Sequence, residues 1–515
     1  MSMFFLADLT TPTANISAIL PEMIVAAAGV VVMLYDSFLP KQRTATTVLS
    51  LVGLIISGVV LATMWNANVP TATWNGMIAH DNLRLAFSFV FLFVSAMTVL
   101  VSGIWIEREN VPAGEYHALL LFATFGMMMM SAGNDLVILF LGLETLSIAT
   151  YVMAGLRKGD LKSNESSMKY FILGSFASAF LLYGMALTYG ATGTTNLTEI
   201  AAKLEAPNFP ALLLIGGAMM IIGFGFKIAM APFHVWTPDV YEGAPTPVTG
   251  FMAAGPKAAA FASFLRVFVL GFPLIAGVPA SVALHETWVT ALAVLAMVTI
   301  LFGNVAAILQ NNVKRMLAYS SIAHAGYALV GFIGAGVAKN AADRDAAIAA
   351  VAFYMLTYAV TNLGAFGIVT LLAQKNDRRA DFEDYNGIGF KSPLMSFSLS
   401  LFMLSLLGLP LTAGFMGKVL VFRPALEGGS PLLTVLVVVA VVGSAISAYY
   451  YLRLIVVMFF RERTSDWAAP KMSVAMNAAL VIAILGVLYF GIFSDGVIER
   501  FSRSPMHVQV VASDR

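Results

Sequence analysis

The chain has 515 residues, of which 59% are hydrophobic and only 11% are charged, with a formal net charge of +1. Soluble globular domains carry about 25% charged residues, so this composition excludes a soluble enzyme, a disordered chain and a nucleic-acid binder with a basic surface. The chain has no cysteine, which excludes disulfides, iron–sulfur ligation and cysteine nucleophiles. An all-α polytopic membrane protein is therefore predicted.

The predicted elements are long apolar helices. A helix needs about 20 mostly apolar residues to cross the hydrocarbon core, and the helical period of these runs disfavours a β-barrel. The first run is not expected to be a signal peptide, because no Lys or Arg precedes it. About fourteen transmembrane helices are predicted, at residues 16–38, 44–65, 82–105, 116–132, 135–155, 166–190, 210–241, 247–271, 285–309, 314–338, 346–374, 393–424, 431–460 and 474–494.

Two of these spans, 210–241 and 393–424, are interrupted by glycine and proline. Paired broken helices at matching places in two halves are the best sequence indication of a transport path. Each is the fourth helix of a group of five, and because five is odd, the two groups are predicted to form an inverted repeat. The predicted parts are an N-terminal three-helix segment (1–115), a first five-helix proton-channel repeat (116–271), a second inverted repeat (285–460), and a C-terminal helix with a tail (461–515).

The distribution of basic residues predicts the orientation. With the N-terminus outside, the cytoplasmic connections hold 16 Lys and Arg residues and the opposite side holds 8. The positive-inside rule therefore predicts that both termini lie on the outer side. The longest hydrophilic stretches, 191–209 and 375–392, are too short for a cofactor-binding domain. No NADH or flavin site is expected in this chain.

Four charged residues lie deep in predicted spans: Lys227, Lys257, Lys418 and Glu144. A charge at the centre of a bilayer is costly, and burial favours the neutral form of lysine, so a series of three lysines indicates groups that exchange protons. A carboxylate close to a lysine favours the charged form, so a pair of Glu144 with a lysine could act as a proton-release switch. The alternatives are a static salt bridge and a lysine bonded to free carbonyl groups.

Two histidines are candidate relay groups. His324 lies inside span 314–338 and His234 lies in the first helix break. The unperturbed pKa of histidine is near 6.5, which suits proton transfer. The alternative for each is a neutral, hydrogen-bonded structural histidine.

Four other basic residues have ordinary interpretations. Arg266 and Arg453 lie near predicted helix ends, where they are expected to extend to the interface. Lys314 and Arg315 begin a span and are expected to be cytoplasmic anchors.

Three longer sequence motifs resemble those of a known protein family. Residues 226–248 (FKIAMAPFHVWTPDVYEGAPTPV), followed by Gly255-Pro-Lys-Ala-Ala, resemble the antiporter-like chain N of the proton-translocating NADH–quinone oxidoreductase, respiratory complex I. Residues 314–327 and 409–418 resemble the same family. The resemblance covers residues 115–460 approximately, and it implies a subunit of this oxidoreductase with no redox site of its own.

The resemblance also implies partners and location. NADH, flavin, iron–sulfur clusters and quinone would be bound by partner subunits, with no cofactor or metal in this chain. Its neighbours would be the lipid bilayer and the other membrane-arm subunits of complex I, chains M, K and J among them. The location would be the inner (plasma) membrane of a bacterium.

The family's functional residues match five positions. Glu144 matches the carboxylate of its fifth helix, Lys227 and Lys418 the lysines of its two broken helices, Lys257 the lysine of its eighth helix, and His324 the histidine of its tenth. A proton from the cytoplasm would then reach Lys227, pass Lys257 and His324, and leave from Lys418, while Glu144 would set the charge of Lys227.

Three other functions stay open on the sequence. A subunit of a sodium/proton antiporter would share the lysines and the broken helices. The membrane arm of a hydrogenase is the second alternative. A membrane scaffold without transport is the third, and it predicts that the buried lysines are dispensable for proton movement.

Overall fold

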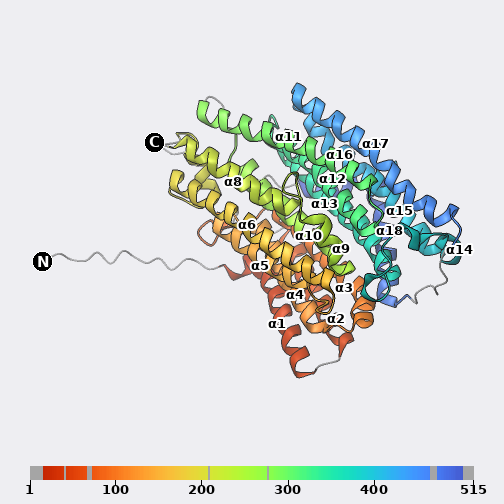
Figure 1. The fold of residues 1–515 in the computed structure, drawn as a ribbon. Helices are drawn as coiled ribbons and strands as arrows, with labels where there is room; N and C mark the ends of the chain where they lie inside the picture. Colours follow the sequence, from red (N-terminus) through yellow and green to blue (C-terminus); the bar gives the residue numbers. More distant parts are fainter. Residues whose placement is uncertain are drawn as a thin grey trace.

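The computed structural model describes residues 15–39, 42–65, 72–206, 209–274, 278–463 and 472–502. Within these ranges the chain is almost entirely helical (Figure 1). The longer helices are α1 (Leu20–Phe38), α2 (Arg43–Met64), α3 (Asn82–Glu109), α4 (Ala113–Ala132), α5 (Leu136–Ala154), α6 (Leu161–Thr192), α8 (Pro210–Ile228), α10 (Thr246–Phe264), α11 (Pro279–Ile308), α12 (Val313–Gly336), α13 (Ala341–Leu372), α15 (Pro393–Leu407), α16 (Ala413–Glu427), α17 (Pro431–Phe460) and α18 (Val474–Ile492).

Shorter elements complete the described fold. Strands β1 and β2 pair antiparallel as a small hairpin, with Ala72 opposite Ala79. The short elements are α7 (Leu197–Lys203), α9 (Thr237–Gly243), α14 (Ile388–Lys391), α19 (Asp495–Ser502), β1 (Ala72–Thr73), β2 (Ile78–Ala79) and a π-helical segment, Leu265–Gly271, that continues α10.

Twelve helices of the described ranges are long and apolar enough to cross a membrane. The prediction of an all-α, multi-pass membrane protein is therefore confirmed. The remaining two predicted spans, 116–132 and 393–424, coincide with α4 and with the pair α15 and α16. The count of fourteen and the inverted repeat stay predictions, and the predicted side of both termini concerns residues outside the described ranges.

The core of the bundle is built by α10, α12 and α13. In their most apolar stretches 94% of residues are buried, against 33% in α1, α2, α17 and α18. Figure 1 shows the three helices in the middle of the molecule, with α1 and α2 at one end and α17 at the other. Apolar side chains on the outer helices face outward, as expected where lipid rather than water surrounds the protein.

The first predicted break is present between α8 and α9. Helix α8 ends at Ile228, and Ala229 adopts a left-handed conformation with φ 62°. Pro232 follows in the non-helical segment, where it cannot donate a backbone hydrogen bond. The carbonyl of Phe226 accepts from the backbone N–H of Ala229 and also from the indole Nε1 of Trp236, each at 3.0 Å, so the side chain of Trp236 ties the segment after the break to the end of α8.

The second predicted break is present between α15 and α16. Helix α15 ends at Leu407, Gly408 takes φ +93°, and α16 starts at Ala413. A glycine suits this position because a side chain is strained at such a φ. Lys227 therefore lies in the last turn before its break, whereas Lys418 lies in the second turn after its own.

Candidate functional site

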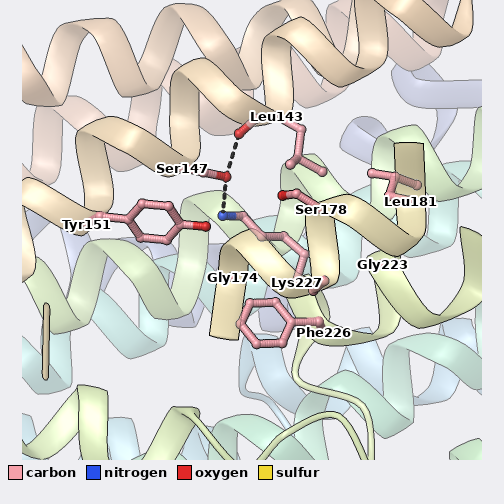
Figure 2. Close-up of a pocket in the computed structure, with 10 residues that line it drawn as sticks. Leu143, Ser147, Tyr151, Gly174, Ser178, Leu181, Gly223, Phe226 and Lys227 are labelled. Carbon is pink, nitrogen blue, oxygen red and sulfur yellow. Dashed lines mark hydrogen bonds between the residues drawn. The ribbon is translucent and has the colours of Figure 1, made fainter. Parts of the chain in front are cut away.

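Lys227 reaches from α8 between α5 and α6 (Figure 2). Its Nζ donates to Ser147 Oγ at 2.8 Å and to Tyr170 OH at 3.3 Å, and it lies 5.3 Å from the centre of the Tyr170 ring. Ser147 in turn donates to the carbonyl of Leu143. The adjoining cavity leaves only about 10 Å³ for water, which is room for about one molecule.

Glu144 lies one turn before Ser147 on α5. The carboxylate accepts a hydrogen bond from Ser178 Oγ at 2.5 Å. Among the described residues no salt bridge joins Glu144 to Lys227 or to another base, so the static salt bridge considered for it is absent there. Glu144 is half-buried, and it shares its face of α5 with the exposed Leu141 and Ile148.

Lys257 is buried in α10, only 3% exposed. Its Nζ donates to the Oγ of Ser321 at 2.6 Å and to the carbonyl of the same residue at 2.9 Å. The ring of Tyr241 lies 5.8 Å from Nζ. Ser321 belongs to α12, so this lysine connects two of the three most buried helices.

His324 follows Ser321 by three residues, on the same face of α12. Its Nδ1 lies 2.7 Å from Tyr354 OH and its Nε2 lies 3.2 Å from Tyr451 OH. Because a hydroxyl both donates and accepts, these contacts permit either protonation state of the ring. The partners are thus tyrosines and not the carbonyl group expected for a structural histidine.

Lys418 returns from α16 to the break before it. Its Nζ donates to the carbonyls of Leu406 and Leu407, at 3.0 and 2.8 Å, and to Ser444 Oγ at 2.7 Å. The alternative of a lysine bonded to free carbonyls is therefore present here. Nζ also lies 4.8 Å from the centre of the Tyr327 ring.

Tyrosines fill the spaces between these groups, and sequence reasoning missed them. On one side, Tyr170 stacks on Trp236 at 4.4 Å, and Trp236 contacts Tyr241 beside Lys257. On the other side, Tyr327 lies 5.5 Å from the His324 ring and also contacts Lys418. The structure thus connects Lys227, Lys257, His324 and Lys418 into one series, although tyrosines in apolar helices gave no distinctive signal.

His234 lies apart from this series. It is 8% exposed, its ring lies 4.4 Å from that of Phe302 on α11, and its Nδ1 has no hydrogen-bond partner among the described residues. No described contact joins it to the buried lysines.

Two interpretations of basic residues were wrong. Arg266 does not extend to the interface: it is 1% exposed and forms a two-bond ion pair with Asp81, each bond 2.8 Å long. Lys314 is not a surface anchor: it is also 1% exposed, with Nζ 3.2 Å from Asp377. Lys314 lies seven residues before Ser321, and this same-face spacing could have identified it.

The described residues contain no group of three or more His, Cys, Asp or Glu side chains able to hold a metal. The groups assembled at the site are proton donors and acceptors. The fold and this site define a class of multi-pass membrane proteins that have two broken helices and a series of buried lysines on and between them.

Comparisons with known proteins identify the family. Residues 133–447 match the family described as NADH:quinone oxidoreductase/Mrp antiporter, TM. NADH-quinone oxidoreductase subunit N of Trichlorobacter lovleyi is 43% identical over 492 residues, covering 95% of this chain and 96% of the relative. The chain therefore belongs to the subunit N family of NADH–quinone oxidoreductases, the antiporter-like membrane subunits of complex I.

Solved structures agree with this fold. A chain of respiratory complex I from Thermus thermophilus is 36% identical with a TM-score of 0.75, covering 93% of this chain and 98% of that one. A chain of the Mrp complex from a Dietzia species is 19% identical with a TM-score of 0.76, covering 95% and 96%. The second likeness concerns the fold alone.

Proposed function

We propose that this chain translocates protons through a buried relay of Glu144, Lys227, Lys257, His324 and Lys418, driven by NADH-to-quinone electron transfer elsewhere in the complex. NADH, flavin, iron–sulfur clusters and quinone are bound by partner subunits in this proposal. Protons come from the cytoplasm and leave on the opposite side near Lys418. His234 is a further candidate relay group, beside the first break.

One observation carries the proposal: three lysines on α8, α10 and α16 are buried in the fold without a carboxylate partner among the described residues. Lys227, Lys257 and Lys418 are 4%, 3% and 5% exposed. Within the described ranges none of the three forms a salt bridge, although Lys162 and Lys169 of α6 and Lys314 at the start of α12 do. Purely structural buried charges are normally paired, whereas hydroxyl partners, which donate as well as accept, suit groups that gain and lose a proton.

The surroundings of Glu144 support a neighbouring subunit on α5 and α6. A carboxylate on an otherwise apolar outward face is unfavourable against lipid. We therefore assign this face to contact with another membrane-arm subunit of complex I, with chains M, K and J as the expected neighbours. The bacterial inner membrane, with both termini on the periplasmic side, is part of the same proposal.

Substitution of the lysines tests the proposal. Lys227→Ala, Lys257→Ala and Lys418→Ala are each expected to lower NADH-driven proton uptake into inverted membrane vesicles, while the complex still assembles on native gels. Lys203→Ala, at an exposed lysine of α7, is the control and should pump normally. Normal pumping by Lys418→Ala at full quinone-reductase rate contradicts the relay. Proton flux that needs Na⁺ and not NADH indicates an antiporter instead.

A further inference from the structure

A polar cavity of about 510 Å³ lies at the end of the bundle predicted to be cytoplasmic. It is bordered by the α5–α6 connection, by α9, by the α11–α12 connection and the start of α12, and by residues 376–381, and it is partly open to the outside. Its lining includes equal numbers of acidic and basic side chains: Asp160, Glu242, Asp377 and Asp381, with Arg157, Lys162, Arg315 and Arg378. This balance and size favour water over a lipid tail or a ligand of a single charge.

Asp377 connects this cavity to the core. Its Oδ2 accepts hydrogen bonds from the backbone and the hydroxyl of Thr246, at 3.1 and 2.8 Å, at the first residue of α10. The same oxygen lies 3.2 Å from Lys314 Nζ and 3.3 Å from Arg157 Nη1. Burial alone would raise the pKa of Asp377, but Lys314 and Arg157 hold that pKa below its ordinary value, so the carboxylate is charged at neutral pH.

Buried polar atoms without partners mark the same region. The Nε of Arg157 and the hydroxyl of Tyr241 are both buried and have no hydrogen-bond partner among the described residues. Buried polar groups are nearly always hydrogen-bonded, to protein or to ordered water. Arg157 lines the cavity, and Tyr241 directly precedes the cavity residue Glu242 on α9, so water entering from the cavity is the partner that we assign to these groups.

The distance from the cavity to the relay follows from α12. Lys314 and Ser321 are seven residues apart on one face of this helix, which corresponds to about 10 Å along its axis. Ser321 holds Lys257, and the Tyr241 ring lies 5.8 Å from the Lys257 ammonium. About three hydrogen-bonded waters, at about 2.8 Å each, together with the Tyr241 hydroxyl, cover that distance.

We propose that protons enter the relay from this cavity, past Lys314 and Asp377 and through the Tyr241 hydroxyl, and arrive at Lys257 without passing Lys227. Each step moves only a proton between oxygen or nitrogen atoms. In the order expected from the sequence the proton reaches Lys227 first, whereas this entrance leads to Lys257 first. It also agrees with the small cavity beside Lys227, which is lined mainly by apolar residues and glycines.

The absence of cysteine from the chain allows a direct test in the intact complex. Gln310→Cys places a thiol in the cavity lining, and Lys158→Cys places one on an exposed residue at the same end, outside the cavity. Inverted vesicles are treated with a membrane-impermeant cationic methanethiosulfonate reagent. Treatment should reduce NADH-driven pumping by Gln310→Cys to the rate of Lys257→Ala. It should leave Lys158→Cys at the rate of equally treated vesicles with the cysteine-free chain.

Tyr241→Phe is the second test, because it removes only the hydroxyl, which lies beside Ser321, the partner of Lys257. Pumping should fall toward the Lys257→Ala rate, while assembly on native gels stays normal and Tyr183→Phe, an exposed tyrosine of α6, pumps normally. Normal pumping by Tyr241→Phe, or by modified Gln310→Cys, overturns the entrance. The inference rests on the proposed function: if these variants pump normally while Lys257→Ala does not, the relay stands and only the entrance fails. If Lys257→Ala also pumps normally, both fail.

Discussion

The pair of Arg84 and Glu22 permits a quantitative test of the fold. Both side chains are 0% exposed, and they connect α3 to α1. Nη2 and Nε of Arg84 donate to Oε1 of Glu22, at 2.7 and 3.0 Å. Arg84 also donates to the carbonyls of Ala18 and Ala79, at 2.6 and 3.2 Å.

Glu22→Gln keeps the shape of the side chain and removes its charge. Arg84 then loses its salt-bridge partner, and removing one partner of a buried pair costs about 3–5 kcal/mol. The unfolding entropy of about 2.1 cal/mol/K per residue gives about 1.1 kcal/mol/K for this chain. The midpoint of thermal unfolding should therefore fall by about 3–5 °C.

The assay is heat-induced aggregation of the chain in isolated membranes, followed by immunoblotting of the soluble fraction. The control is Glu427→Gln in the pair with Arg423, whose side chains are 55% and 72% exposed. An exposed pair contributes about 0–1 kcal/mol, so the control should lower the midpoint by about 1 °C or less. Equal shifts for the two variants would refute the assigned energy of the buried pair.

Three further predictions concern the site. Gly414→Ala should reduce pumping, because its Cβ would lie 1.8 Å from the Ser405 carbonyl and would displace the helix that carries Lys418, whereas Gly103→Ala, with open space around it, should pump normally. Asp377→Asn should lower thermal stability at pH 7. The pKa of this carboxyl is depressed in the folded state, so its contribution to stability is complete above the unfolded pKa of about 3.9 and is lost as the pH falls through the folded pKa. The difference in stability between Asp377→Asn and wild type, measured by the same immunoblot, should therefore shrink below about pH 4. A difference that stays constant with pH would contradict this. Ser147→Ala should slow pumping by removing a Lys227 partner, and a wild-type rate would show that this contact is dispensable.

The sequence by itself determined the membrane fold and the charged candidates for the site, but not the tyrosines between them. Apolar runs of sufficient length leave helices as the main solution in a bilayer, and both breaks occur where glycine and proline predicted them. Deep charges are rare enough in such runs to be recognised one by one, which is why Lys227, Lys257 and Lys418 were identified. The family, too, was recognisable from the motif at residues 226–248.

Only the tertiary structure decided which partners these groups have. The sequence allowed Glu144 to pair with a lysine. In the structure the Glu144 carboxylate instead accepts a hydrogen bond from Ser178, and Lys227 donates a hydrogen bond to Ser147. Arg266 and Lys314 were assigned to the interface because linear distance to a helix end does not reveal which residues lie opposite. The N-cap residue of α3 supplies Asp81 to Arg266, and the connection after α13 supplies Asp377 to Lys314. Partner choice depends on which faces meet across the bundle, and helical periodicity gives the faces of each helix but not their pairing.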